Sequence, residues 1–172
     1  MNRLVPQSVA VAALCLMAVS TSVQAQNPAP EAASYPIGVL PPGKARPAWM
    51  NEKGEVLDPA KVESGFGTAV KGLNGWEGEV TGIPAPGSKF TELKIGMPMK
   101  QATDIVGVPT DQGAYVTGKA WIPFYFGSDR YRYEVVYKGL GRLIFAGSSG
   151  IGISSSGNLI WIIHSANEGG YR

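Results

Sequence analysis

The chain has 172 residues, of which 44% are hydrophobic and 16% are charged, and its formal net charge is +2. The charged fraction is too low for a disordered, solvated polymer, and the length suits one domain with a modest hydrophobic core. Because the charge is close to balanced, composition gives no reason to expect a nucleic-acid partner.

Residues 1–25 have the features of a cleavable export signal. Arg3 supplies a positive start, residues 9–19 are nearly all apolar, and Val23 and Ala25 occupy the small-residue positions before the expected cut. We predict cleavage after Ala25 and a mature protein in the periplasm or at the periphery of the outer membrane. The apolar run is shorter than the roughly 18 to 20 residues that span a bilayer, so we expect no transmembrane segment in the mature chain.

Cys15 is the only cysteine, and it lies inside the apolar run of the signal. The mature chain would therefore have no cysteine, which excludes disulfides and cysteine-ligated metals. Lipid attachment requires a small residue directly before the cysteine. Leu14 stands there, so the sequence disfavours a lipid anchor.

Residues 26–48 form a proline-rich lead without apolar periodicity. They contain six of the 13 prolines, at positions 28, 30, 36, 41, 42 and 47. Such a composition predicts an extended linker. This linker could serve as a specific recognition peptide or only as a spacer that extends the reach of the domain, and both alternatives remain open.

Residues 49–87 are interpreted as an extension that precedes the main domain. Asp58 and Pro59 are typical of a helix start. Four apolar residues then recur at helical spacing: Val62, Phe66, Val70 and Leu73. This spacing predicts a helix over 58–72 whose apolar face continues to Leu73. Two glycines within this stretch would each cost about 1 kcal/mol in a helix interior. A short strand is expected at 76–81.

Residues 88–172 are interpreted as the main domain. Its first part predicts a short helix, a break at Gly96, and a second helix that opens at Pro98 and stops at Gly107. The apolar residues of both helices should form one layer that packs on a sheet: Phe90, Leu93, Met99, Ala102, Ile105 and Val106.

After the second helix, the sequence changes from a helical to an alternating pattern. Strands are expected at 121–126, 131–138, 143–146 and 159–164, with a flexible glycine-serine connection at 147–157. The predicted fold is therefore α+β, with two short helices packed on an antiparallel sheet of about three to four strands. The signal peptide and the Pro-rich lead precede it.

One set of residues in this domain resembles a known family. It consists of Ile95, Gly96, Met97, Gln101, Gly107 and Pro109, followed by an aromatic strand with Trp121 and Tyr125. The set is similar to that of the SmpA/OmlA, or BamE-like, family of outer-membrane assembly lipoproteins, and the resemblance covers residues 88–172. It implies a BamE-like domain that binds an envelope protein in outer-membrane or envelope assembly or maintenance. Pro98 replaces the family's capping hydroxyl, so a capping box with Gln101 cannot form.

The two-helix fold is also similar to that of beta-lactamase inhibitory proteins, which act by binding a partner protein. Fold alone does not choose between these roles. The alternative function is therefore an inhibitor-like binding module that docks on a periplasmic or secreted enzyme. A third hypothesis, of another class, is a small hydrolase that uses His164.

Aromatic and arginine residues of the expected strands suggest a protein-binding surface: Trp121, Tyr125, Arg130, Arg132 and Tyr133. Exposed side chains of these types are common in protein interfaces. The alternative is that residues 49–87 cover this surface.

Few residues qualify as catalytic. His164, the one histidine, ends an apolar strand and is interpreted as a hydrogen-bonded structural residue. Glu77 and Glu79 would share a strand face, which is more typical of plain surface than of a glycosidase pair. Without a second histidine or a mature cysteine, we expect no metal and no cofactor, and we predict a protein that is not an enzyme.

Overall fold

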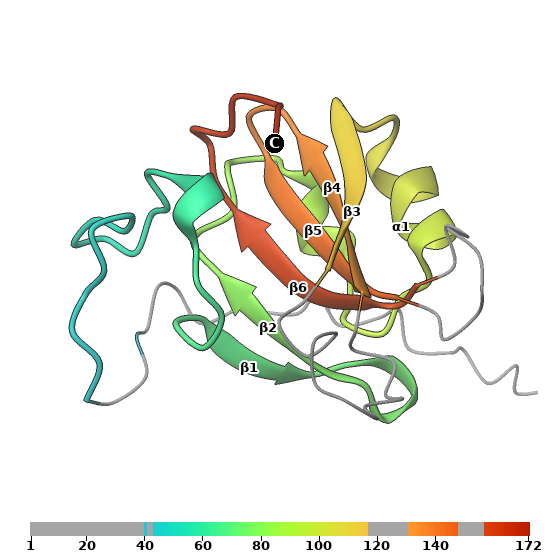
Figure 1. Ribbon diagram of the computed structural model, residues 1–172, viewed down its shortest axis with the longest axis horizontal. Coiled ribbons are helices and arrows are strands. Elements are labelled where there is room, and N and C mark those ends of the chain that lie inside the picture. Colours follow the sequence, from blue (N-terminus) through green and yellow to red (C-terminus); the bar gives the residue numbers. More distant parts are fainter. Residues whose placement is uncertain (1–39, 41–42, 117–130, 148–156) are drawn as a thin grey trace, which may run out of the picture. The chain divides into compact units, whose positions relative to one another are not determined.

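The computed structural model describes residue 40 and residues 43–116, 131–147 and 157–172. These residues build a six-stranded sheet in the order β1-β2-β6-β5-β4-β3 (Figure 1). The strands are β1 (Thr68–Lys71), β2 (Glu77–Thr81), β3 (Asp111–Val116), β4 (Tyr131–Tyr137), β5 (Gly141–Ala146) and β6 (Leu159–His164). Strands β2 and β6 are parallel, and the other neighbours are antiparallel.

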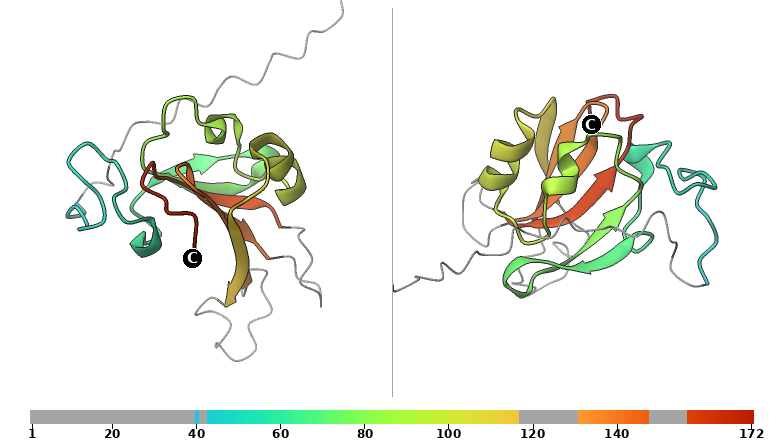
Figure 2. Two further views of the ribbon diagram at one scale, coloured as in Figure 1. Left: turned by 90° about the horizontal axis from the view of Figure 1, so that it is seen from above. Right: turned by 180° about the vertical axis from the view of Figure 1, so that it is seen from behind.

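The helical elements are short. Those in the described residues are three 3-10 turns, η1 (Pro59–Lys61), η2 (Leu73–Gly75) and η3 (Lys89–Glu92), and one α-helix, α1 (Met99–Val106). Figure 2 shows η3 and α1 on the same side of the sheet. Within the described ranges, no helix has the length and apolar character that a membrane span requires.

The predicted fold class is wrong. In place of two helices on an antiparallel sheet of three to four strands, the described chain has one α-helix and a six-stranded mixed sheet. The first expected helix is a 3-10 turn whose N-cap, Ser88, accepts a hydrogen bond from the Phe90 amide at 3.2 Å. Two of the additional strands, β1 and β2, come from residues 49–87, because β2 pairs with the distant β6.

The helix predicted over 58–72 is also wrong, since this segment holds η1 and then β1. The apolar spacing on which that prediction depended has another cause. Val62 and Phe66 pack on one side of the sheet, whereas Val70 packs on the other. The chain therefore crosses from one face of the sheet to the other in this segment. Its apolar residues keep a helical spacing although they do not lie on a helix.

Strand β3 had no signal in the sequence. Its residues, DQGAYV, show neither alternation nor a buried apolar run, yet all six pair with residues of β4. Backbone pairing with β4 holds β3 at the edge of the sheet, so the side-chain pattern of β3 contributes little to its formation. The strand expected at 121–126 and the connection at 147–157 lie largely outside the described residues.

Helix α1 begins without a side-chain cap, as expected from Pro98. Other contacts hold its start against the beginning of β6. The Met99 amide donates to the Gly157 carbonyl at 2.9 Å, and the Asn158 side-chain amide donates to the Gly96 carbonyl at 2.7 Å. A backbone carbonyl and a side-chain amide from a distant segment thus fix the helix start that a capping box would otherwise fix.

A first core lies between the sheet and the η3–α1 layer. Phe90, Leu93, Met99 and Ala102 are buried in it, and Ile105 and Val106 pack against it. The prediction that these six side chains form one layer on the sheet is confirmed. Leu143 and Ile162 are among the sheet residues that they cover, and both are fully buried.

A second core lies on the opposite face of the sheet. Trp161 and Ile163 of β6 pack there with Trp49, Met50 and Val56 from the segment that precedes β1. From Trp161 to Ile163, successive residues of β6 thus point into different cores, because side chains alternate along a strand. A register shift against β5 interrupts this alternation before Trp161, so Ile160 and Trp161 lie on the same face. The central strand is buried on both faces, which explains why its sequence is apolar throughout.

The C-terminal tail is held by a buried ion cluster. Arg142 on β5 is 6% exposed, and its Nε donates to Glu168 Oε2 at 2.5 Å while its Nη1 donates to Glu134 Oε1 at 3.0 Å. Desolvation acts to lower the pKa of Arg142, but the bonds to the two carboxylates outweigh it, and the pKa is raised. Arg142 also donates to the Tyr171 carbonyl at 3.1 Å, so the cluster fixes the last residues of the chain.

His164, at the end of β6, is fully buried, and its ring lies 5.9 Å from that of Phe90 in the first core. Burial lowers the pKa of His164 from 6.5 to about 4. The imidazole is therefore neutral in the folded protein at neutral pH. Its position inside the core agrees with a structural role for this histidine.

Removal of one member of the ion cluster should be costly. We expect Glu168→Ala to lower the free energy of unfolding by about 3–5 kcal/mol, because it leaves the Arg142 charge buried with one partner fewer. Chemical denaturation measures this loss. Glu92→Ala, at an exposed position of η3, is the control and should change stability by no more than about 0.5 kcal/mol. Similar small losses in both variants would contradict the role of the cluster.

The His164 pKa predicts a loss of stability in acid. From pH 6.5 down to about 4, the unfolded state binds a proton that the folded state does not. The free energy of unfolding should therefore fall with pH across this window, by about 3 kcal/mol in total. In His164→Gln, the part of this fall that comes from protonation of His164 should be missing. Urea denaturation of both proteins across the window measures the difference, and parallel pH curves would refute the assignment.

Candidate functional site

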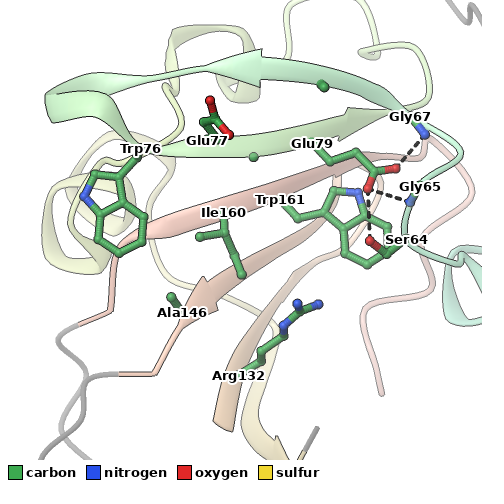
Figure 3. Close-up of a pocket in the computed structure, with 12 residues that line it drawn as sticks. Ser64, Gly65, Gly67, Trp76, Glu77, Glu79, Arg132, Ala146, Ile160 and Trp161 are labelled. Atoms are coloured by element: carbon green, nitrogen blue, oxygen red, sulfur yellow. Dashed lines mark hydrogen bonds between the residues drawn. The ribbon is translucent and has the colours of Figure 1, made fainter. Parts of the chain in front are cut away.

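A cavity of about 610 Å³ opens on the sheet face that carries the second core (Figure 3). Strands β1, β2, β4, β5 and β6 contribute to its walls, together with the loop that precedes β1. The cavity therefore combines residues that lie far apart in the sequence. It includes charged, aromatic and aliphatic side chains.

The hollow exists because small residues occupy its floor. Ala69 on β1 is the register partner of Glu79, and Ala146 on β5 is the register partner of Arg132. All four residues line the cavity. Paired strand residues point to the same face, so each alanine leaves open the volume beside a long charged neighbour.

Two indole rings stand at opposite ends of the cavity, with Ile160 between them (Figure 3). Trp161 is 7% exposed, and its Nε1 donates to Thr81 Oγ1 at 2.9 Å, which fixes the ring. Trp76 is half-buried and packs against the first core at the start of β2. Both rings are therefore positioned by the fold before any ligand arrives.

Glu79 anchors the loop that precedes β1. Its carboxylate accepts hydrogen bonds from the amides of Gly65 at 2.7 Å and Gly67 at 2.5 Å, and from Ser64 Oγ at 3.2 Å. A Cβ on Gly67 would come within 2.3 Å of Thr81 Oγ1, so only glycine lets this loop approach β2 closely. The loop thus forms a fixed wall of the cavity.

Glu77 and Arg132 line the cavity from different strands, β2 and β4. Glu77 is exposed and makes no ion pair or hydrogen bond within the part of the chain that the structure describes. Lys71 is its register partner on β1, but no ion pair joins the two. Glu77 thus presents an unneutralised carboxylate beside the Trp76 end of the cavity.

Of the residues that were predicted to form a protein-binding surface, the structure describes only Arg132 and Tyr133 and places them on opposite faces. Trp121, Tyr125 and Arg130 lie outside the described residues. Arg132 lines the cavity, whereas its neighbour Tyr133 packs against the first core on the other face. Strand alternation forces this separation, because adjacent residues point to opposite sides.

Glu77 and Glu79 share a strand face, as expected, and both line the cavity. Their environments differ, since Glu79 is engaged by the loop and Glu77 is not. The lining contains no histidine, because His164 lies against Phe90 in the first core. Among the described residues, no three His, Cys, Asp or Glu side chains gather to hold a metal ion. The arrangement suits binding through aromatic and ionic contacts.

Sequence reasoning missed Trp76, Ile160 and Ala146 as site residues. The alternation along β2 placed Glu77 and Glu79 together, but it carried no information on which strand would lie beside them. That neighbour is β6, whose Trp161 pairs in register with Glu79. The site could have been found only with this pairing known.

Comparison with known proteins yields no relative: no protein-family model, no curated protein and no solved structure matches the chain. A functional proposal therefore depends on the geometry of the cavity and on the sequence motifs.

The anchoring role of Glu79 predicts a local effect. In Glu79→Gln we expect the amides of Gly65 and Gly67 to exchange with solvent about tenfold faster, because hydrogen bonds to a charged acceptor are lost. Hydrogen exchange followed by NMR measures this. Glu77→Gln, on the same strand face, is the matched control and should leave both rates unchanged. Equal rates in all three proteins would show that Glu79 does not hold the loop.

Proposed function

We propose that the protein is exported to the cell envelope and acts there by binding another protein through the cavity face of its sheet. The observation that carries the proposal is the cavity itself, with an indole at each end and charged residues on its walls. Tryptophan and arginine are enriched at the energetic centres of protein interfaces.

The rigidity of the site supports binding. Trp161 is fixed by Thr81, and the loop wall is fixed by Glu79. A site that is ordered before binding loses little conformational entropy when a partner arrives. The cavity volume of about 610 Å³ is in the range of pockets that accept a small ligand or a few side chains.

The envelope location rests on the sequence. Residues 1–25 have a positive start, an apolar run and a small residue at Ala25, which together are typical of a secretory signal. The corresponding location is the periplasm or the periphery of the outer membrane. The resemblance of the segment around Gly96 and Gln101 to BamE-like proteins supports the same compartment and a narrower role in outer-membrane assembly or maintenance.

A second candidate is an inhibitor-like module that docks on a periplasmic or secreted enzyme. The position of the cavity on a sheet face favours it, because such a face can receive a protruding loop of an enzyme. The hydrolase hypothesis has no support of this kind: His164 is buried beside Phe90, and its lowered pKa of about 4 is too far from neutrality for efficient acid-base work at neutral pH.

Site-specific photo-crosslinking in cells tests the proposal. A photoreactive residue at position 64, on the exposed loop wall of the cavity, should give a crosslinked partner, whereas one at position 92, on exposed η3, should not. Ala146→Phe fills the floor of the cavity and should reduce the crosslink at least tenfold, with folding checked by circular dichroism. Crosslinks of equal yield from both positions, or an unchanged yield in folded Ala146→Phe, would contradict binding through this face.

A further inference from the structure

The charges of the cavity are not balanced. Among the lining residues that the structure describes, Glu77 and Glu79 contribute two negative charges and Arg132 one positive charge, which leaves a net charge of −1. This local sign is opposite to that of the whole chain, whose formal net charge is +2. The described lining therefore favours a positively charged ligand over a negatively charged one.

The two carboxylates are not equivalent toward a ligand. The oxygens of Glu79 already accept the amides of Gly65 and Gly67, which disperse its charge. Glu77 has no such partner within the described residues. The carboxylate that is available to a ligand is thus that of Glu77, at the start of β2.

Apolar surface lies directly beside this carboxylate. Trp76 is the preceding residue, and its indole forms one end of the cavity, while Ile160 projects between the two rings (Figure 3). An indole face attracts a cation and also packs against methylene groups. The Glu77 end of the cavity therefore matches a cationic head on an apolar stem.

Arg132 sets the direction of such a ligand. It lines the cavity from β4, beyond β6 and β5 as counted from the β2 wall that carries Glu77. A cation close to Glu77 would be attracted by its carboxylate, whereas the guanidinium of Arg132 offers a cation no such attraction. The arrangement thus favours one orientation, with the positive head toward β2.

We propose that the partner inserts a lysine or arginine side chain into this cavity, with its charged head at Glu77 and its stem along Trp76 and Ile160. The inference rests on the proposed binding function and specifies what the cavity recognises. A lysine ammonium or an arginine guanidinium on three or four methylenes has the required combination of charge and apolar length.

Short peptides test the inference directly. The probe is acetyl-Ala-Leu-Lys-Leu-Ala-amide, compared with peptides that carry norleucine or glutamate in place of lysine. Binding to the full mature chain is measured by NMR at peptide concentrations up to the millimolar range, from the indole N–H shifts of Trp76 and Trp161. The lysine peptide should bind more tightly than the norleucine peptide, and the glutamate peptide should bind most weakly.

Variants assign the effect to the proposed residue. Glu77→Gln should weaken binding of the lysine peptide about fivefold, the upper range for one exposed ion pair, and added salt should weaken binding to the unaltered protein. Glu92→Gln removes the same charge from an exposed site on η3 and should have no effect. Ala146→Phe should abolish the shifts by filling the cavity.

Three results would overturn the inference: no binding of any peptide, equal binding of the three peptides, or equal affinity in Glu77→Gln. These results are separable from a failure of the proposed function. If the crosslink in cells is lost in Ala146→Phe but is unchanged in Glu77→Gln, the cavity binds a partner and the basic side chain is refuted. If Ala146→Phe also leaves the crosslink unchanged, the binding function itself fails.

Discussion

The parallel pairing of β2 with β6 is the contact on which the rest of this structure depends. It joins a strand that precedes α1 to the last strand of the chain and places β6 inside the sheet, with β5 on its other side. A strand in that position has both faces buried, and Ile162 and Trp161 enter different cores accordingly. Two layers must then cover the sheet. The η3–α1 segment supplies one, and the segment around Trp49 supplies the other.

The same pairing creates the cavity. It sets Glu79 of β2 beside Trp161 of β6, and the antiparallel strands beyond continue the surface to Arg132. Ala69 and Ala146 leave the volume open. A binding site made in this way is as rigid as the sheet itself, which favours recognition by fit and charge. The proposed insertion of a basic side chain uses this rigidity, because the carboxylate of Glu77 and the indole of Trp76 need no rearrangement to receive it.

Sequence reasoning was reliable where local chemistry decides structure. The alternation at 131–138 and the apolar runs at 143–146 and 159–164 correspond to β4, β5 and β6. The apolar layer of residues 90–106 packs on the sheet as predicted. The reasoning failed where partners are distant, as for the helix expected over 58–72. Val62, Phe66 and Val70 follow a helical period, yet they serve opposite faces of the sheet. Periodicity records which residues are apolar and not which core receives them.

The sequence by itself determined the break at Gly96, the start of α1 after Pro98, the strand character of residues 131–138, 143–146 and 159–164, and the shared face of Glu77 and Glu79. Each follows from backbone preference or side-chain alternation over a few residues. Tertiary structure alone decided the six-stranded mixed sheet and the opposite faces taken by the predicted binding residues Arg132 and Tyr133. Tertiary structure alone also decided the edge strand β3 and the cavity. Each depends on which strands pair, and strand pairing is a contact between segments far apart in the chain that no local pattern encodes.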